Sequence, residues 1–142
     1  MRFVKDDGGR AAAGYIGDAR DCVTRAIAIA TGKSYQEVYD RLNELAKTER
    51  SSVRRKGKSN ARTGVHRVTY DKYLVELGWV WTPTMLIGSG CKVHLKDGEL
   101  PNGRLIVSLS KHNVAVIDGV IHDTYDPSRG GTRCVYGYWR KE

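Results

Sequence analysis

No apolar run in this sequence approaches the roughly 20 residues needed to cross a bilayer. The first ten residues carry charge and glycine but no apolar segment, so they do not resemble a secretory signal. Internal repeats and low-complexity tracts are absent as well. We therefore expect a cytoplasmic protein of the producing or host cell, with no membrane association.

Cysteine is scarce and its spacing is uninformative. Cys22, Cys91 and Cys134 are widely separated, odd in number and contain no CxxC pair. Such a set is a poor disulfide framework and lacks the spacing of a zinc ribbon. We expect Cys91 and Cys134 to be core or strand residues. No cofactor and no metal site are expected.

What the chain does contain is the balance of a globular protein. Its 142 residues are 40% hydrophobic and 28% charged, which fits one domain over residues 1–142. A first helix is predicted from Cys22, with Asp21 as its N-cap and Gly32 at its end. Its buried stripe follows the i, i+3, i+4, i+7 rule at Val23, Ala26, Ile27 and Ala30.

Two further helices are predicted before the hydrophobic pattern changes from the period of a helix to that of a strand. Ser34 and Glu37 form a capping box, followed by an apolar face at Tyr35, Val38, Tyr39, Leu42 and Leu45. The third helix is indicated by Tyr70, Tyr73, Leu74 and Leu77 and is closed by Gly78. Strands are then predicted at 79–81, 85–87, 93–95, 105–109, 113–117, 120–124 and 134–139. This order predicts an α+β domain with N-terminal helices packed on a C-terminal antiparallel sheet.

The positive charge is concentrated in one segment. The window 50–67 holds no acidic residue and carries +7 of the net charge of +8. Serine, glycine and asparagine make it read as a long loop, which is either simply solvated or an electrostatic contact for nucleic acid or an acidic protein. It contains no aromatic residue, which argues against a single-strand stacking platform. The candidate contacts are Arg54, Arg55, Lys56, Lys58 and Arg62, flanked by Arg50 and Arg67.

Cys22 stands where a thiol can become reactive. The partial positive charge at a helix N-terminus favours a thiolate, and the unpaired N–H groups of the first turn can bind an oxyanion. The alternative is a small buried core residue. His112 could act as the base for Cys22, because imidazole exchanges protons near neutral pH.

A third group is needed to orient that imidazole. Asp118-Gly119 is a strong two-residue turn signal that pairs Ile117 with Val120. This register puts Asp123 on the face of His112 as its diagonal neighbour. Asp126 is the second choice. A zinc site from Cys22, His112 and His122 is disfavoured, because alternation separates the two histidines.

These segments resemble papain-like cysteine peptidases, specifically compact bacterial and phage branches such as the NlpC/P60-like and C39-like families. The likeness lies in Asp21-Cys22-Val23-Thr24-Arg25-Ala26 and in the two strands joined by Asp118-Gly119. Papain-type enzymes often have a glutamine before the cysteine as an oxyanion donor. The only glutamine here is Gln36, so Tyr15 is the candidate donor.

The resemblance implies a papain-like fold and a Cys22-His112-Asp123 triad without a cofactor. The expected activity is that of a cysteine peptidase or amidase acting on a peptide, isopeptide or other amide, or of an acyl transferase. The alternative is a non-enzymatic module on the same scaffold, which binds nucleic acid or an acidic protein through the basic segment. An inhibitor of another protein is a third interpretation.

Overall fold

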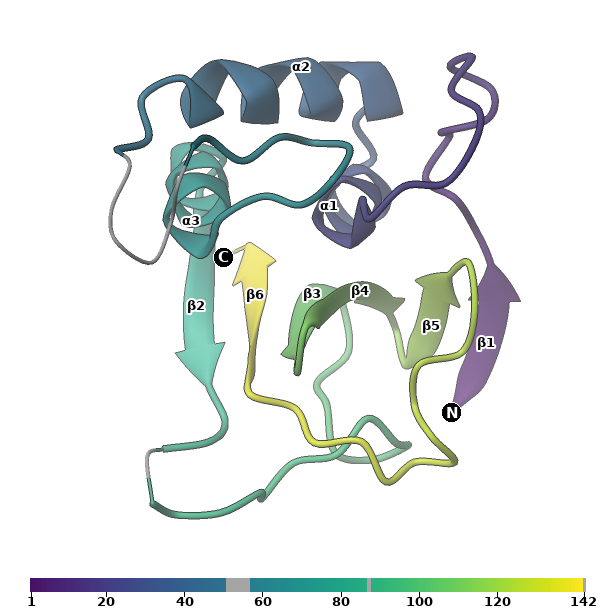
Figure 1. Ribbon diagram of the computed structural model, residues 1–142. Coiled ribbons are helices and arrows are strands. Elements are labelled where there is room, and N and C mark those ends of the chain that lie inside the picture. The colour runs from purple at the N-terminus through teal and green to yellow at the C-terminus, as the bar shows by residue number, and fades with distance from the viewer. Residues whose placement is uncertain (51–56, 87, 142) are drawn as a thin grey trace.

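The computed structural model describes residues 1–50, 57–86 and 88–141 as an α+β fold. Three helices lie over one face of a six-stranded sheet, and long loops run beneath the other face (Figure 1). The helices are α1 (Cys22–Thr31), α2 (Tyr35–Ala46) and α3 (Arg67–Glu76). None of these described helices has the length and apolar character of a membrane span.

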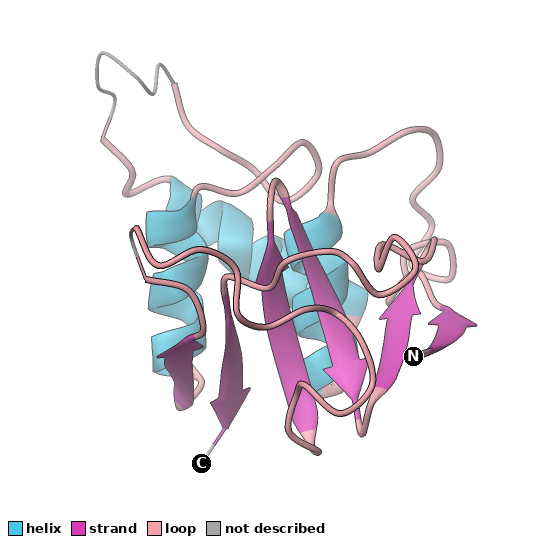
Figure 2. Ribbon diagram, turned by 90° about the horizontal axis from the view of Figure 1, so that it is seen from below, coloured by secondary structure: helices cyan, strands magenta, loops and turns pink. Residues whose placement is uncertain are grey.

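The sheet is mixed, not wholly antiparallel as the sequence predicted. Its strands are β1 (Arg2–Lys5), β2 (Trp79–Pro83), β3 (Arg104–Leu109), β4 (His112–Ile117), β5 (Val120–Asp123) and β6 (Gly137–Lys141). They lie side by side in the order β1-β5-β4-β3-β6-β2 (Figure 2). β1 pairs with β5 in parallel, whereas the other neighbours are antiparallel. The sequence missed β1 because all four of its residues are exposed and show no alternation.

The predicted start and end residues of the helices are confirmed at most positions. α1 begins at Cys22 and ends at Gly32, whose φ of 75° closes the helix. Ser34 accepts a hydrogen bond from the Glu37 backbone, as a capping box requires. Asp21 is the N-cap residue of α1 as predicted, but its carboxylate makes no cap hydrogen bond and instead accepts from Arg25 and Tyr35.

The hairpin of β4 and β5 has the predicted register. Ile117 pairs with Val120, and Asp118 and Gly119 take positive φ values of 47° and 76° in the turn. β5 ends at Asp123, one residue earlier than expected. The predicted strand at 93–95 is wrong, since only His94 forms an isolated bridge, to Cys134. The described residues of 85–87 are not in a strand either.

The core is divided between the two faces of the sheet. Helical side chains such as Ile27, Leu42 and Leu74 pack on Ile106 and Ala115 of the upper face. Side chains from the lower face pack against the loops beneath the sheet; among them are Leu105, Val107, Val114, Val116 and Ile121. Fully burying such side chains contributes about 1.5–3 kcal/mol each, so both layers fix the position of β4.

The loops beneath the sheet are joined by a disulfide between Cys91 and Cys134, with their Cα atoms 5.8 Å apart. This corrects the expectation that the cysteines form no framework and that both are core or strand residues. Cys91 is exposed. The pairing joins residues 43 positions apart, and nothing in the local sequence around either cysteine indicates that the two loops meet. Cys22 is the one free thiol.

Candidate active site

Cys22 is the first residue of α1, and the sequence places it there through its apolar stripe. The helix packs across β4, so its N-terminal turn faces the start of that strand. First-turn N–H groups have no partner within a helix, which leaves them able to bind an anion at the helix start. Cys22 therefore combines a partly buried thiol with a source of partial positive charge.

His112 opens β4 directly after Lys111, which turns the chain with a φ of 57°. Its imidazole is buried, and Nε2 lies 2.6 Å from Oδ2 of Asp123 at the end of β5. A carboxylate accepts, so Nε2 carries the proton and Nδ1 remains for Cys22. The structure thus brings Asp123 to His112, as the predicted register requires.

The ionisation of Cys22 and His112 is coupled. Burial opposes ionisation of the thiol, but hydrogen bonding and Coulomb attraction to His112 outweigh it and lower the pKa of Cys22 below its ordinary value. Burial alone would lower the pKa of His112, yet Asp123 and Cys22 raise it to about 9. Asp123 is also buried, but His112 holds the pKa of its carboxyl below the usual range. These directions all favour a thiolate-imidazolium pair.

Beneath the pair lies a charged network that the sequence reading missed. Arg25, buried one turn into α1, donates to Oδ1 of Asp123 at 3.2 Å and to Asp21. Tyr35 donates to the other oxygen of Asp21 at 2.6 Å. The available signal was the spacing i, i+4 between Asp21, just before the helix, and Arg25, the one charged residue within it, where an unpaired charge is costly. Arg25 ties the nucleophile helix to the carboxylate that holds His112.

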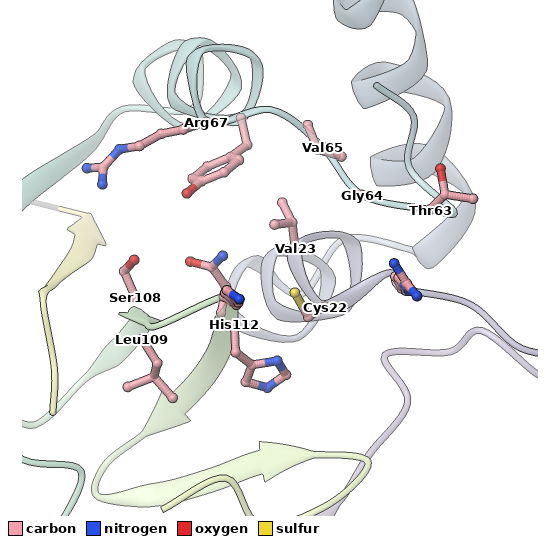
Figure 3. Close-up of a pocket in the computed structure, with 13 residues that line it drawn as sticks. Cys22, Val23, Thr63, Gly64, Val65, Arg67, Ser108, Leu109 and His112 are labelled. Atoms are coloured by element: carbon pink, nitrogen blue, oxygen red, sulfur yellow. The ribbon is translucent and has the colours of Figure 1, made fainter. Parts of the chain in front are cut away.

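Cys22 and His112 line a cleft of about 360 Å³ (Figure 3). Its walls come from the start of α1, from the segment before α3 and from the turn between β3 and β4. The lining residues are Arg20, Cys22, Val23, Thr63, Gly64, Val65, Arg67, Tyr70, Ser108, Leu109, Lys111, His112 and Asn113. A smaller hollow of about 250 Å³ adjoins the pair on the side of Arg25 and Tyr125. The thiol therefore lies in a groove and not behind core side chains.

Two sequence candidates are not brought to this site. Tyr15 donates its hydroxyl to Gln36 and packs on Tyr35 and Tyr39, and it does not line the cleft. It is therefore not placed as an oxyanion donor. Asp126, the second choice for the third group, accepts from the Ser128 backbone in the loop after β5, whereas His112 is held by Asp123.

Where it is described, the basic segment is a loop up to the start of α3, as predicted, with one isolated bridge between Asn60 and Gly64. Arg62 donates to the backbone carbonyls of Ile16 and Asp18, and Lys58 to those of Lys47 and Glu49. These two cations therefore hold the protein's own loops together, which reduces what they offer to an anionic partner. Arg50 is exposed, and Arg54, Arg55 and Lys56 lie outside the described residues.

Arg67, at the end of that window, begins α3 and is not part of the loop. Its guanidinium lies 4.5 Å from the ring centroid of Trp81, and Nε is 3.4 Å from Asp71. The described residues contain no group of three potential metal ligands. His122 instead lies 3.7 Å from Asp6, from Nδ1 to Oδ2.

No protein-family model, no curated protein and no solved structure matches this chain. The geometry of the site is therefore the basis for the functional argument.

Proposed function

We propose that this chain is a cysteine-dependent hydrolase with a papain-like fold, acting on a peptide or another amide. The observation that carries the proposal is the coupled pair: the thiol at the head of α1 interacts with an imidazole that Asp123 holds at 2.6 Å, at the floor of an open cleft. A buried core cysteine has no such imidazole beside it, and His94 and His122, which also lie near carboxylates, do not line the cleft.

The chemistry follows the general logic of thiol acyl transfer. The Cys22 thiolate attacks the carbonyl carbon, and the C=O electrons move to oxygen to give a tetrahedral oxyanion. The oxyanion collapses, the C–N bond breaks, and the His112 imidazolium gives its proton to the departing amine. A thioester to Cys22 remains.

The second half restores the enzyme. Neutral His112 takes a proton from water, and the hydroxide oxygen attacks the thioester carbonyl. The C–S bond then breaks, which releases a carboxylic acid and returns the thiolate-imidazolium pair. An amine in place of water would make the same chain an acyl transferase.

Each surrounding group has a role in this sequence. Asp123 fixes the imidazole with Nε2 protonated and stabilises its positive charge. The backbone N–H of Cys22 at the head of α1 is a donor for the oxyanion. Arg25 acts through Asp123 and is a positioning residue, because it lies beneath the pair.

The order of elements supports the papain-like fold. The nucleophile opens an early central helix, the histidine opens a later strand, and the orienting carboxylate ends the next strand of the same hairpin. This is the arrangement that the family resemblance implies. Because the cleft is open at the pair, an extended acyl substrate can reach the sulfur.

Thiol alkylation across pH tests the proposal directly, since Cys22 is the one free thiol when the disulfide is intact. We expect iodoacetamide to label Cys22 with a midpoint well below the usual thiol pKa of about 8.5. In His112→Ala the midpoint should rise, because the hydrogen bond and the charge of His112 no longer oppose burial and only the Asn113 backbone and Arg25 still lower the pKa of the thiol.

The matched control is His94→Ala, since His94 contacts Glu99 in the loops beneath the sheet and does not line the cleft. That variant should label as the parent does. Equal midpoints in the parent and His112→Ala would rule out the coupled pair, and with it the proposed hydrolase.

A further inference from the structure

Two cations stand at the rim of the cleft beside the reactive pair. Arg20 lies two residues before Cys22, and Lys111 lies directly before His112; both are exposed. Both line the cleft and the smaller adjoining hollow. Arg20 also lines a third hollow next to the cleft. We refer to Arg20 and Lys111 as the rim cations.

The rim cations are not neutralised by the protein. Among the described residues neither forms an ion pair, and no carboxylate lines the cleft. Two acidic side chains line the adjoining hollows: Asp18 in the third hollow, and Asp21 in the smaller one, where Arg25 and Arg10 already pair with it. Arg67 differs, because Asp71 and the face of Trp81 already occupy its guanidinium.

The buried network beneath the rim does not supply the missing negative charge. Its anions are balanced, since three negative groups are matched by three positive ones when the thiol is ionised. The set is Cys22, Asp21 and Asp123 against His112, Arg25 and Arg10, whose Nε lies 3.6 Å from Asp21. The groove that a substrate enters is thus left with the uncompensated charge of the rim cations.

We propose that the substrate presents a carboxylate to Arg20 and Lys111, so that the enzyme acts on an acidic peptide, with Asp or Glu next to the scissile amide. This inference rests on the proposed function. The two cations line the same hollows as Cys22, Arg20 from the segment before α1 and Lys111 from the β3–β4 turn, so a carboxylate bound by them would bring the neighbouring carbonyl to the thiol. Exposed charge pairs of this kind change binding by about two- to fivefold each.

An acidic peptide fits the cleft better than a nucleic acid does. Val23, Val65 and Leu109 give the walls an apolar character suited to amino-acid side chains. The one aromatic side chain in the cleft is Tyr70, which is 8% exposed and cannot serve as a stacking platform. Tyr125 is an exposed ring in the smaller hollow, where its centroid lies 5.4 Å from that of the His112 imidazole, and it does not line the cleft.

The first test needs no substrate. Iodoacetate and iodoacetamide carry the same reactive carbon, but only iodoacetate is an anion. We expect the ratio of their rates at Cys22 to favour iodoacetate in the parent and to fall about two- to fivefold in Arg20→Gln and in Lys111→Gln, and further in the double variant. The control Lys72→Gln removes one exposed positive charge from α3, outside the cleft, and should keep the parent ratio.

Salt gives an independent check on the same ratio. Raising the salt from about 0.01 M to about 1 M shortens the screening length from about 30 Å to about 3 Å. The ratio in the parent should therefore fall toward that of the double variant. A ratio that is the same in the parent and the double variant at low salt would overturn the inference, even if Cys22 and His112 prove to be a coupled pair.

The second test identifies the class of anion. A peptide containing Glu and Asp, its Gln and Asn counterpart, and oligothymidylate of equal charge are each used to protect Cys22 from iodoacetamide, and the peptides are assayed for cleavage. We expect the acidic peptide to protect the thiol and to be cleaved faster than its neutral counterpart. Protection by oligothymidylate alone would overturn the acidic-peptide inference and favour the binding module. Protection by the acidic peptide without cleavage would keep the inference on the ligand while removing the proposed hydrolase.

Discussion

The two ends of α1 open onto hollows that look alike but differ in chemistry. At the N-terminal end, a cleft of about 360 Å³ contains Cys22 and His112. At the C-terminal end, a hollow of about 470 Å³ is lined by Lys33, Arg104 and Lys141. Both are basic, and the second is larger. Size and positive charge are therefore not what distinguishes a reactive site in this protein.

The difference lies in how the charged groups are used. Arg104 donates to the carbonyls of Ile29 and Ala30 at the end of α1, and Lys33 pairs with Glu37 at 3.1 Å. Arg104 thus completes the helix end, where backbone carbonyls lack partners, and Lys33 is neutralised by Glu37 of α2. At the other end, by contrast, the Cys22 thiol and the His112 imidazole shift each other's pKa. This coupling is the mark of a functional site.

The largest expected effect is on turnover, which should depend on the N-terminal end of α1 and not on its C-terminal end. Cys22→Ala should lower turnover of an acidic peptide by about a thousandfold or more, because the acyl-enzyme can no longer form. Arg104→Gln, at the other end, should leave turnover near that of the parent. Steady-state kinetics on the purified variants measures both. If Cys22→Ala retained full turnover, the distinction between the two ends would disappear.

A smaller difference between the two ends of α1 is expected in the free energy of unfolding. Arg25→Met leaves Asp21 and Asp123 buried without their shared cation, which should cost about 3–5 kcal/mol in the free energy of unfolding. Arg104→Met removes hydrogen bonds to exposed carbonyls and should cost about 1 kcal/mol. Urea unfolding followed by circular dichroism gives both values. Equal costs would mean that the network under Cys22 is no more important than a helix end.

The smallest effect concerns the proton of His112. Asp123→Asn removes the negative charge that helps to raise the pKa of His112 to about 9, so the pKa should fall and turnover should drop about ten- to hundredfold. The alkaline limb of the activity profile should move to lower pH with it. Titration of the imidazole by NMR measures the pKa, with His94 as the reference. If the alkaline limb of the activity profile of Asp123→Asn stayed near pH 9, Asp123 would be excluded as the group that orients His112.

The same pKa sets a stability window. Because the folded pKa of His112 lies above its ordinary value of 6.5, the stabilisation by its partners is complete below about pH 6.5 and is lost as pH rises through about 9. For Asp123 the folded pKa is lowered, so its contribution is present at neutral pH and is lost under acid conditions. The parent should therefore lose stability on the alkaline side, and Asp123→Asn should lose less there.

The sequence predicted the parts of the site that depend on neighbouring residues. The stripe of α1 placed Cys22 at a helix start, and Asp118-Gly119 fixed the register that brings Asp123 to His112. Both are local signals of period or turn chemistry. The cleft itself could not be predicted, because its wall at 63–65 comes from the segment before α3, whose docking depends on tertiary contacts.

Long-range pairings were missed for the same reason. β1 joins β5 across more than a hundred residues and carries no alternation, and the disulfide joins two loops with no shared motif. Arg25 appeared as one polar residue in an apolar helix. Its role depends on Asp123, 98 positions further along the chain, so only the fold reveals it.

The separation of the site residues along the chain has a consequence for synthesis. Cys22 emerges from the ribosome well before His112 and Asp123, which follow it by 90 and 101 residues. Until then the thiol has no imidazole, and Arg25 has only Asp21 to pair with. A nascent chain should therefore hold its cysteine as an ordinary, protonated thiol, and reactivity should appear abruptly when the late hairpin docks against α1. Such timing would keep an immature protein from attacking its neighbours.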